Sequence, residues 1–298
     1  MIRLLLFFIT IFELGFSQVS FRGMNAWTHG QTVGLSGGGY LFKIQNEFRN
    51  PAMLSDSNRN FKINLVKYPA GISGQSIMAN GKWNKHRFGL KINRINYGFF
   101  EGKNDNNQIE DNYSAGDTHF KLAYARSSNS GRFSIGVTGG LFLSRIDNLN
   151  ATALTFSPGF VFYSRFGQLG ISLQNVGSIL YSYTNKNEKL PSSIVTSLAG
   201  KIPNTPLELE VDHAYSLEGR KAVLIFSGLL YLRNGLIIKG GTSTNKSAQM
   251  TDVSFVKNLF SDVGLGVSYE FEDILFDLNT HAYGPGGFVF AFGLSVRY

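Results

Sequence analysis

The chain has 298 residues, and its composition separates it from ordinary soluble proteins. Charged residues make up 16% of the sequence, against roughly 25% in soluble domains, whereas aromatic residues reach 14% and glycine occurs 34 times. The absence of cysteine excludes disulfides and thiolate metal sites. The formal net charge is +8, but Lys and Arg are scattered along the chain, so the charge alone does not indicate a partner.

The first 17 residues have the pattern of a secretory signal peptide. Arg3 supplies the positive charge, Leu4–Phe12 form the apolar core, and Gly15 and Ser17 are small residues at the cleavage-relevant positions. The apolar run is much shorter than the ~20 residues that a membrane-spanning helix needs. We therefore predict that residues 1–17 direct export of the protein.

Residues 18–60 do not show the alternation of a strand. The segment contains Gly37–Gly39 and the tripeptide Asn50–Ala52, together with apolar residues such as Trp27 and Phe42. This apolar content disfavours disorder. We expect a plug or hatch that packs against the strands that follow. The alternative is a disordered periplasmic tail.

From residue 61 onward, apolar and small polar residues alternate with period two, which is typical of strands that expose one face to lipid. Around Arg94 the apolar parity switches, which a bulge or the membrane boundary would explain. Residues 223–232 are apolar on both faces, so we expect something to pack inside there. We predict about 14 strands, which start near residues 61, 72, 86, 116, 130, 152, 167, 193, 206, 220, 235, 262, 273 and 287.

The last strand shows the alternation most clearly. It reads FVFAFGLSVRY from Phe288 to Tyr298, and a tilted strand needs about 9–11 residues to cross a bilayer. The terminal aromatic residue fits an interfacial girdle. The C-terminal pattern also looks like the signal that barrel-insertion machinery reads, and that machinery is an expected partner. The residues of this pattern are Phe292, Leu294, Val296 and Tyr298.

The lengths of the predicted links support a membrane barrel. Three links are long, at residues 102–115, 177–192 and 245–261, and all follow odd-numbered strands. Bacterial barrels have long external loops and short periplasmic turns. We therefore predict an all-β fold: a transmembrane antiparallel barrel at residues 61–298, in the outer membrane and in contact with its lipid, with residues 18–60 in the lumen.

Three carboxylates share one inward row, Glu208, Glu210 and Asp212. Such a row could bind a cation or a basic substrate. The alternative, which we favour, is a row of lumen charges paired with inward Lys91, Lys121 or Lys201, because a polar barrel interior needs counter-charges.

No catalytic constellation is visible. The histidines have no recognisable spacing with Ser and Asp, and the motif HExxH and the phosphate-binding P-loop are absent. Asp277 and His281 share an inward face, but a separation of four residues along a strand is too far for direct contact. We expect no enzyme activity, no metal and no cofactor, and an exported barrel is not expected to bind nucleic acid.

Short motifs resemble those of FadL-like outer-membrane proteins. Asn50, Pro51 and Ala52, ahead of the barrel, are similar to the N-terminal element of that group. Asn175-Val176-Gly177 at a strand end, followed by Leu190 and Pro191, resembles the PorV/PorQ branch. The stretch INYGFFEG at residues 95–102 is closer to PorQ than to PorV.

This resemblance implies a 14-stranded FadL-type barrel and a role in the type IX secretion system of Gram-negative, Bacteroidota-like bacteria. The protein would then bind secreted cargo or components of the cell-surface attachment complex. The alternative is a FadL-like channel for hydrophobic small molecules. These two hypotheses differ at the lumen, because a channel needs a pocket with an exit, whereas a partner-binding barrel can be tightly plugged.

Overall fold

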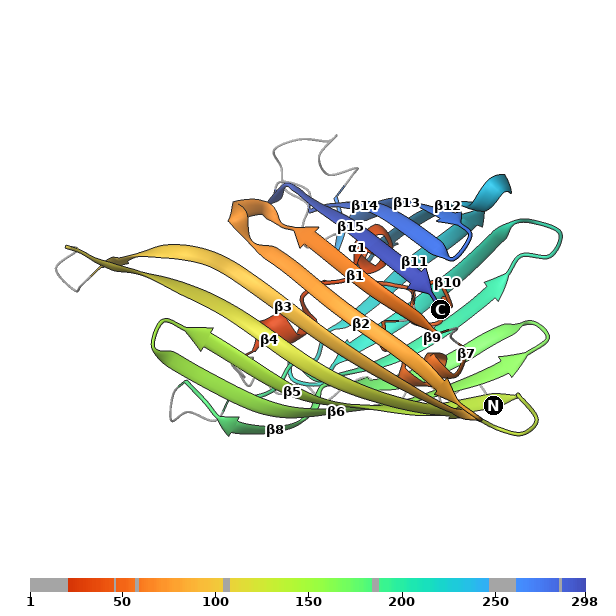
Figure 1. The fold of residues 1–298 in the computed structure, drawn as a ribbon, viewed down its shortest axis with the longest axis horizontal. Helices are drawn as coiled ribbons and strands as arrows, with labels where there is room; N and C mark the ends of the chain where they lie inside the picture. Colours follow the sequence, from red (N-terminus) through yellow and green to blue (C-terminus); the bar gives the residue numbers. More distant parts are fainter. Residues whose placement is uncertain are drawn as a thin grey trace, which may run out of the picture.

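A computed structural model describes residues 21–45, 47–56, 59–103, 108–183, 188–246, 261–283 and 286–298. The predicted signal peptide and residues 18–20 therefore lie outside the described residues. Within the described ranges, no helix has the length and apolar character that a membrane span requires. Most of the chain forms one antiparallel sheet (Figure 1).

The sheet contains fifteen strands in chain order. Their bounds are β1 Asn60–Lys67, β2 Ser73–Trp83, β3 His86–Lys103, β4 Ile109–Ser127, β5 Phe133–Ile146, β6 Leu149–Ser164, β7 Gly167–Gln174, β8 Val176–Tyr181, β9 Ser193–Lys201, β10 Leu207–Ser216, β11 Ala222–Tyr231, β12 Leu236–Ser243, β13 Val263–Phe271, β14 Ile274–Ala282 and β15 Phe288–Arg297. Single 3₁₀ turns, η3 (Pro69–Gly71) and η4 (Arg233–Gly235), join β1 to β2 and β11 to β12.

The sheet closes on itself as a barrel of 14 wall strands. The last strand pairs with the first, from Asn60 opposite Arg297 to Lys67 opposite Phe290. β7 and β8 both pair with β6 and together form one wall strand. The strand is interrupted at Asn175, whose φ of 52° is left-handed. The predicted closed antiparallel barrel is confirmed.

The predicted alternation is also confirmed. In β15, Phe288 and Phe290 are exposed on the outer surface, while Val289 and Ala291 are buried inside. An outer surface of exposed apolar side chains is what lipid contact requires, because the hydrocarbon offers no hydrogen-bond partners. On β11, Ile225 and Leu229 point inward and are buried, as expected for a strand that is apolar on both faces.

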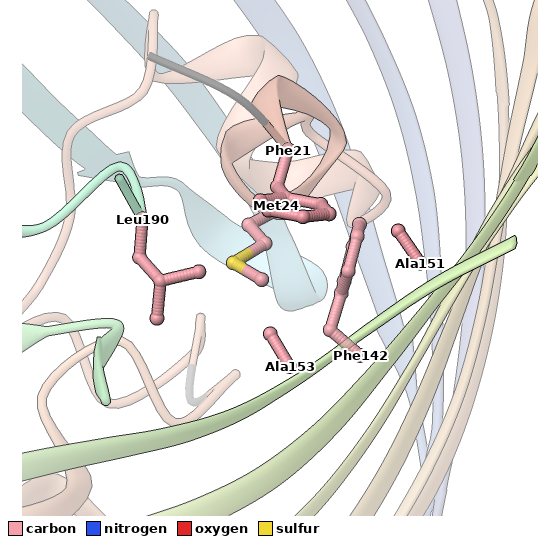
Figure 2. Close-up of a cluster of buried hydrophobic side chains, with 6 residues drawn as sticks. All are labelled: Phe21, Met24, Phe142, Ala151, Ala153 and Leu190. Atoms are coloured by element: carbon pink, nitrogen blue, oxygen red, sulfur yellow. The ribbon is translucent and has the colours of Figure 1, made fainter. Parts of the chain in front are cut away.

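The N-terminal segment, residues 21–45 and 47–56, lies inside the barrel and is called the plug below. It contains η1 (Arg22–Asn25), α1 (Gly30–Gly34) and η2 (Pro51–Asp56), drawn in red and orange in Figure 1. Five buried apolar clusters join it to the wall. In one of them, Phe21 and Met24 of the plug pack against Phe142 of β5 and Leu190 (Figure 2). This packing explains the apolar residues of a segment that forms no strand.

Two expectations about the outer end need correction. β3 runs to Lys103 and β4 begins at Ile109, not near 116, so most of the expected link 102–115 is a two-stranded ribbon. The segment is polar, which resembles a loop in sequence, yet cross-strand hydrogen bonds can hold such a ribbon outside lipid. The expected link 177–192 begins as β8, and residues 247–260 of the third link lie outside the described residues.

The parity switch at Arg94 marks a chemical boundary, since the backbone alternation continues through it. Ile95, like Lys91, is buried inside, and Arg94 remains exposed outside. The register shift lies further along, between Asn96 and Gly98, where Gly98 has a φ of 95°. The outer surface therefore turns polar at Arg94, as expected where a strand leaves lipid.

Glycines of the wall accommodate the plug backbone. A Cβ on Gly136 of β5 would lie 2.5 Å from the amide nitrogen of Ala52, and one on Gly159 of β6 would lie 2.7 Å from Cδ of Pro51. Gly139, three residues after Gly136 in β5, has nothing within 4 Å of the equivalent position. Only glycine lets η2 lie directly on the wall at positions 136 and 159.

Gly136→Val is expected to displace η2, because the new side chain would occupy the space of the plug backbone. The purified protein should then be cleaved by trypsin at Arg49, which the wild type protects. Gly139→Val adds the same atoms to the same strand at an open position, so it should leave the protection intact. Equal protection in both variants would contradict the contact between η2 and the wall.

Candidate functional site: the plugged lumen and its outer chamber

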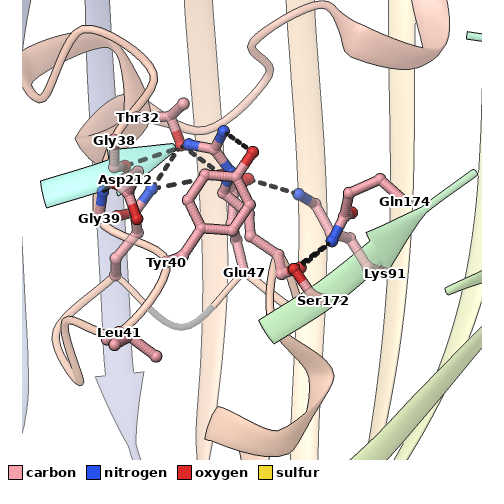
Figure 3. Close-up of polar contacts among 12 residues, drawn as sticks. Thr32, Gly38, Gly39, Tyr40, Leu41, Glu47, Lys91, Ser172, Gln174 and Asp212 are labelled. Carbon is pink, nitrogen blue, oxygen red and sulfur yellow. Dashed lines mark hydrogen bonds and ion pairs between the residues drawn. The ribbon is translucent and has the colours of Figure 1, made fainter. Parts of the chain in front are cut away.

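The predicted carboxylate row holds the backbone of the plug. Asp212 accepts a hydrogen bond from the Gly39 amide at 3.1 Å (Figure 3). Glu210 accepts one from the Leu41 amide at 2.9 Å. Gly39 has a φ of 87°, a conformation that glycine adopts without strain. An irregular segment in a barrel has backbone donors that no ladder satisfies, so these carboxylates supply the missing acceptors.

The predicted partners of the row differ from those in the structure. Glu208 accepts a hydrogen bond from the Tyr231 hydroxyl at 2.9 Å, and Lys91 instead pairs with Glu47 of the plug. Within the described ranges, no ion pair joins the row to Lys91, Lys121 or Lys201, and no group of three His, Asp or Glu side chains is placed to hold a metal. The lysine prediction missed that the plug itself supplies the donors.

A second polar centre surrounds Glu47. Its carboxylate lies 2.7 Å from Nζ of Lys91 on β3 and 3.7 Å from Nε of Arg49, and it accepts a hydrogen bond from Thr32. The Arg49 guanidinium also donates to the Tyr40 hydroxyl at 2.6 Å. Burial is the largest single influence and raises the pKa of Glu47, but Lys91, His29 and Arg49 together outweigh it, so the pKa lies below the ordinary value.

The wall fixes the plug near β14 as well. Asp277 accepts hydrogen bonds from Gln31 of α1 at 2.8 Å and from Lys239 of β12. His281 lies 3.3 Å from Asp262 instead. Asp277 and His281, whose spacing along the strand predicted no direct contact, therefore have separate partners.

The motif residues Asn50, Pro51 and Ala52 form the start of η2. The buried Asn50 side chain donates to the Phe160 carbonyl of β6 at 3.2 Å and accepts from the Ala52 amide at 3.1 Å. Asn50 thereby stabilises the turn and attaches it to the wall. The structure gives these three residues a role in seating the plug.

The second group of motif residues lies at the interrupted wall strand. Asn175 donates its side-chain amide to Asn25 of the plug at 3.0 Å, and its carbonyl accepts from Ser192 at 3.0 Å. A Cβ on Gly177 would overlap the Leu154 carbonyl. Leu190, which precedes Pro191, covers Phe21 and Met24 (Figure 2). Asn175 and Leu190 therefore both contact the plug, and Asn50 attaches the plug to the wall from within it.

The C-terminal residues lie where the alternation placed them. Phe292 and Tyr298 are exposed on the outer surface, and Leu294 and Val296 are partly exposed. The Tyr298 hydroxyl donates to the Asn80 carbonyl at 2.9 Å, which attaches the chain end to β2. Recognition of these residues by the insertion machinery remains a prediction.

An outer chamber of about 480 Å³ lies between the plug and the wall. Its lining includes the outer ends of β10 and β12, at Ser216 and Ser243. Aromatic and basic side chains share the lining: Trp27, Tyr40, Phe48, Arg49, Lys91 and Lys121. The sequence analysis did not identify Glu47 and Arg49. Charged residues within an apolar-rich segment that is expected inside a barrel could have indicated that these two residues form part of a site.

Among the described residues, two cations that line this chamber lack a protein partner, Lys121 and the exposed Lys221. Lys121 stands beside Lys91 in the register of β3 and β4, but Lys91 is neutralised by Glu47. Among the residues that the structure describes, Lys121 forms no hydrogen bond or ion pair. The chamber therefore combines aromatic surface with an uncompensated positive charge.

Acidification is expected to loosen the plug. Burial lowers the pKa of His29 from 6.5 to about 3, with Glu47, Lys62, Lys91 and Asp277 around it. Between pH 6.5 and 3, His29 therefore binds a proton in the unfolded chain but not in the folded protein. The free energy of unfolding consequently falls as the pH drops from 6.5 toward 3. The lowered pKa of Glu47 acts in the same direction, because its contribution is full above 4.5 and declines below it.

The emission of Trp27 measures this loosening. The sequence has two tryptophans, and Trp27 packs against His281 with ring centroids 4.9 Å apart, so Trp83→Phe leaves one reporter in the plug. Its emission should shift between pH 6.5 and 3, and Glu47→Gln should reduce the change below pH 4.5, where His29 still contributes. A Trp27→Phe protein reports the wall as control. Constant Trp27 emission down to pH 3 would contradict the mechanism.

Comparison with known proteins yields similarity of structure only. No family model matches the chain, and no curated protein matches it. The toluene transporter TodX of Pseudomonas putida is 11% identical, with a TM-score of 0.57 over 90% of this chain and 94% of TodX. A FadL homologue from Pseudomonas aeruginosa is 11% identical, with a TM-score of 0.55 over 91% and 98%. The chain therefore has the fold of FadL-type outer-membrane barrels.

Proposed function

We propose that this outer-membrane barrel admits small hydrophobic molecules with an anionic group into its outer chamber. The observation that carries the proposal is that aromatic side chains of the plug, Trp27, Tyr40 and Phe48, share the chamber with the unpaired Lys121 of the wall. Aromatic side chains bind the apolar part of such a ligand, and an ammonium in a partly dry site attracts its charge. The similarity to a toluene transporter and to a FadL homologue supports this proposal over a role confined to protein binding.

Passage beyond the chamber requires the plug to move. Hydrogen bonds and ion pairs attach it to the wall at Asp212, Lys91 and Asp277. Polar contacts can be exchanged for water when the plug shifts, whereas its apolar clusters resist displacement. The chamber is therefore the site where a solute would be held before the plug opens.

Binding of a fluorescent fatty-acid analogue to the purified barrel tests the proposal. Lys121→Gln should weaken binding of the anionic probe by about tenfold, the equivalent of one charge-assisted contact. The same variant should bind toluene as the wild type does. Lys85→Gln, an exposed lysine at the short-turn end, is the matched control. Equal binding of the anion by wild type and Lys121→Gln would contradict the role of the chamber.

A second candidate is a component of type IX secretion that binds cargo or attachment-complex proteins. The short motifs suggest it, and one structural observation favours it. The ribbon formed by the ends of β3 and β4 extends beyond the neighbouring strands (Figure 1). It exposes large apolar residues away from the core, with Phe99 83% and Ile109 73% exposed. Exposed apolar surface of this kind is typical of a protein-binding site.

Co-purification from native outer membranes tests this second candidate. Phe99→Ser/Ile109→Ser should remove attachment-complex proteins or type IX cargo that co-purify with the wild type. Glu101→Gln/Lys103→Gln breaks an exposed ion pair on the same ribbon and should retain them. A wild-type barrel that carries only lipid or a small solute would rule out the secretion role and favour the chamber.

A further inference from the structure

The outer surface of β3 to β6 changes character within a few residues on every strand. Ile92, Phe120, Leu141 and Leu154 lie opposite one another in register across the four strands and form an apolar row. Two positions further toward the outer end, the residues on β3, β4 and β6 are polar: Arg94, Thr118 and Thr152. The wall therefore leaves the hydrocarbon just beyond the apolar row.

A groove of about 590 Å³ lies on the outer surface at this level. Arg94 of β3 and Arg145 of β5 line it from either side. Between them stands Gly116 of β4, in register with both Asn96 and Arg145. Because Gly116 has no side chain, the wall is hollow between the two arginines.

The spacing of the two arginines suits one ligand. They lie two strands apart across the sheet. Along the strands they are offset by two residues, because Arg145 is in register with Asn96 rather than with Arg94. With about 4.8 Å between strands and 3.3 Å per residue, their Cα atoms are roughly 12 Å apart. Arginine side chains are long enough to converge from this distance on one phosphorylated group.

The charge in the groove is unbalanced. Among the described residues that line it, none is acidic. Arg94 forms no hydrogen bond or ion pair within the described part of the chain, and it is exposed. Arg145 donates Nε–H to the Asp147 carbonyl at 2.8 Å, which orients the guanidinium and uses one of its donors. Hydroxyl and amide groups also line the groove, among them Thr118, Asn150 and Thr152, and Phe99 lines it as well.

We propose that this groove binds the phosphorylated headgroup of an outer-leaflet lipid. Guanidinium groups match phosphate geometry with paired hydrogen bonds, and neighbouring hydroxyl groups donate to the remaining oxygens. The apolar row directly below contacts the acyl chains of the same molecule. Leu143, in the lining at the lipid side, continues that apolar surface. A soluble phosphate would leave this adjoining lipid-facing surface unused, so the proposed ligand is a lipid.

The test uses the full barrel in nanodiscs that contain diphosphoryl lipid A, with bound lipid counted by native mass spectrometry. Wild type is expected to retain the lipid, and Arg94→Gln/Arg145→Gln should retain it at least tenfold less. Arg126→Gln/Arg132→Gln removes two arginines near the short-turn ends of β4 and β5. It should retain the lipid as the wild type does. Heat-modifiable migration on a gel verifies that each variant is folded.

Thr118→Glu provides an independent test if the double variant does not fold. It places a carboxylate on the floor of the groove while both arginines remain, and it should abolish retention. Dephosphorylated lipid A should bind no better to the wild type than to the double variant. Equal retention by wild type and double variant, or an equal loss in the control, would overturn the proposal. Full displacement by inorganic pyrophosphate would also overturn it, in favour of a soluble anion.

Discussion

The structure depends on satisfying an irregular backbone inside a closed barrel. Wall strands pair with each other, so they offer a segment in the lumen no free ladder positions. The plug must therefore find acceptors and donors on side chains. Glu210 and Asp212 accept from its amides, Asn64 accepts from the Gly30 amide at 3.1 Å, and Lys62 donates to the Ile44 carbonyl at 2.8 Å. The polar side chains on the inner face of the wall are thus placed to form hydrogen bonds with the backbone of the plug in this one conformation.

Because the plug and the wall pair many of each other's polar groups, the charges that remain unpaired indicate where a ligand could bind. Several lumen charges are neutralised within the barrel, by the plug in the pair Glu47–Lys91 and within the wall in the pair Asp277–Lys239. A charge without a partner is then conspicuous in physical terms, because its desolvation is not offset. Lys121 in the chamber is such a charge. On the outer surface, the exposed Arg94 also lacks a partner among the described residues, and the two residues point to different ligands on opposite sides of the same wall.

The barrel could be predicted from sequence because period-two patterning is local. Thirteen of the fourteen predicted strand starts lie within three residues of the observed ones, and the exception, at Ile109, follows from a polar ribbon whose stability comes from pairing rather than patterning. The inward position of Glu208, Glu210 and Asp212 followed from alternation as well. The hydrogen-bond partners of these carboxylates could not be predicted, because the plug is irregular and its sequence shows no periodic pattern that indicates its path. Glu47 and Arg49 were missed for the same reason.

The glycines beneath the plug have a consequence for recognising related chains. Gly136 and Gly159 face inward where Pro51 and Ala52 lie against the wall. The positions of these two glycines in the wall sequence therefore reflect where the plug packs. A substitution in η2 and a substitution at an inward glycine affect the same packing contact, so the effect of one on stability depends on the other. Paired changes at these positions would reveal an equivalent plug in a divergent barrel even after the Asn-Pro-Ala tripeptide has been lost.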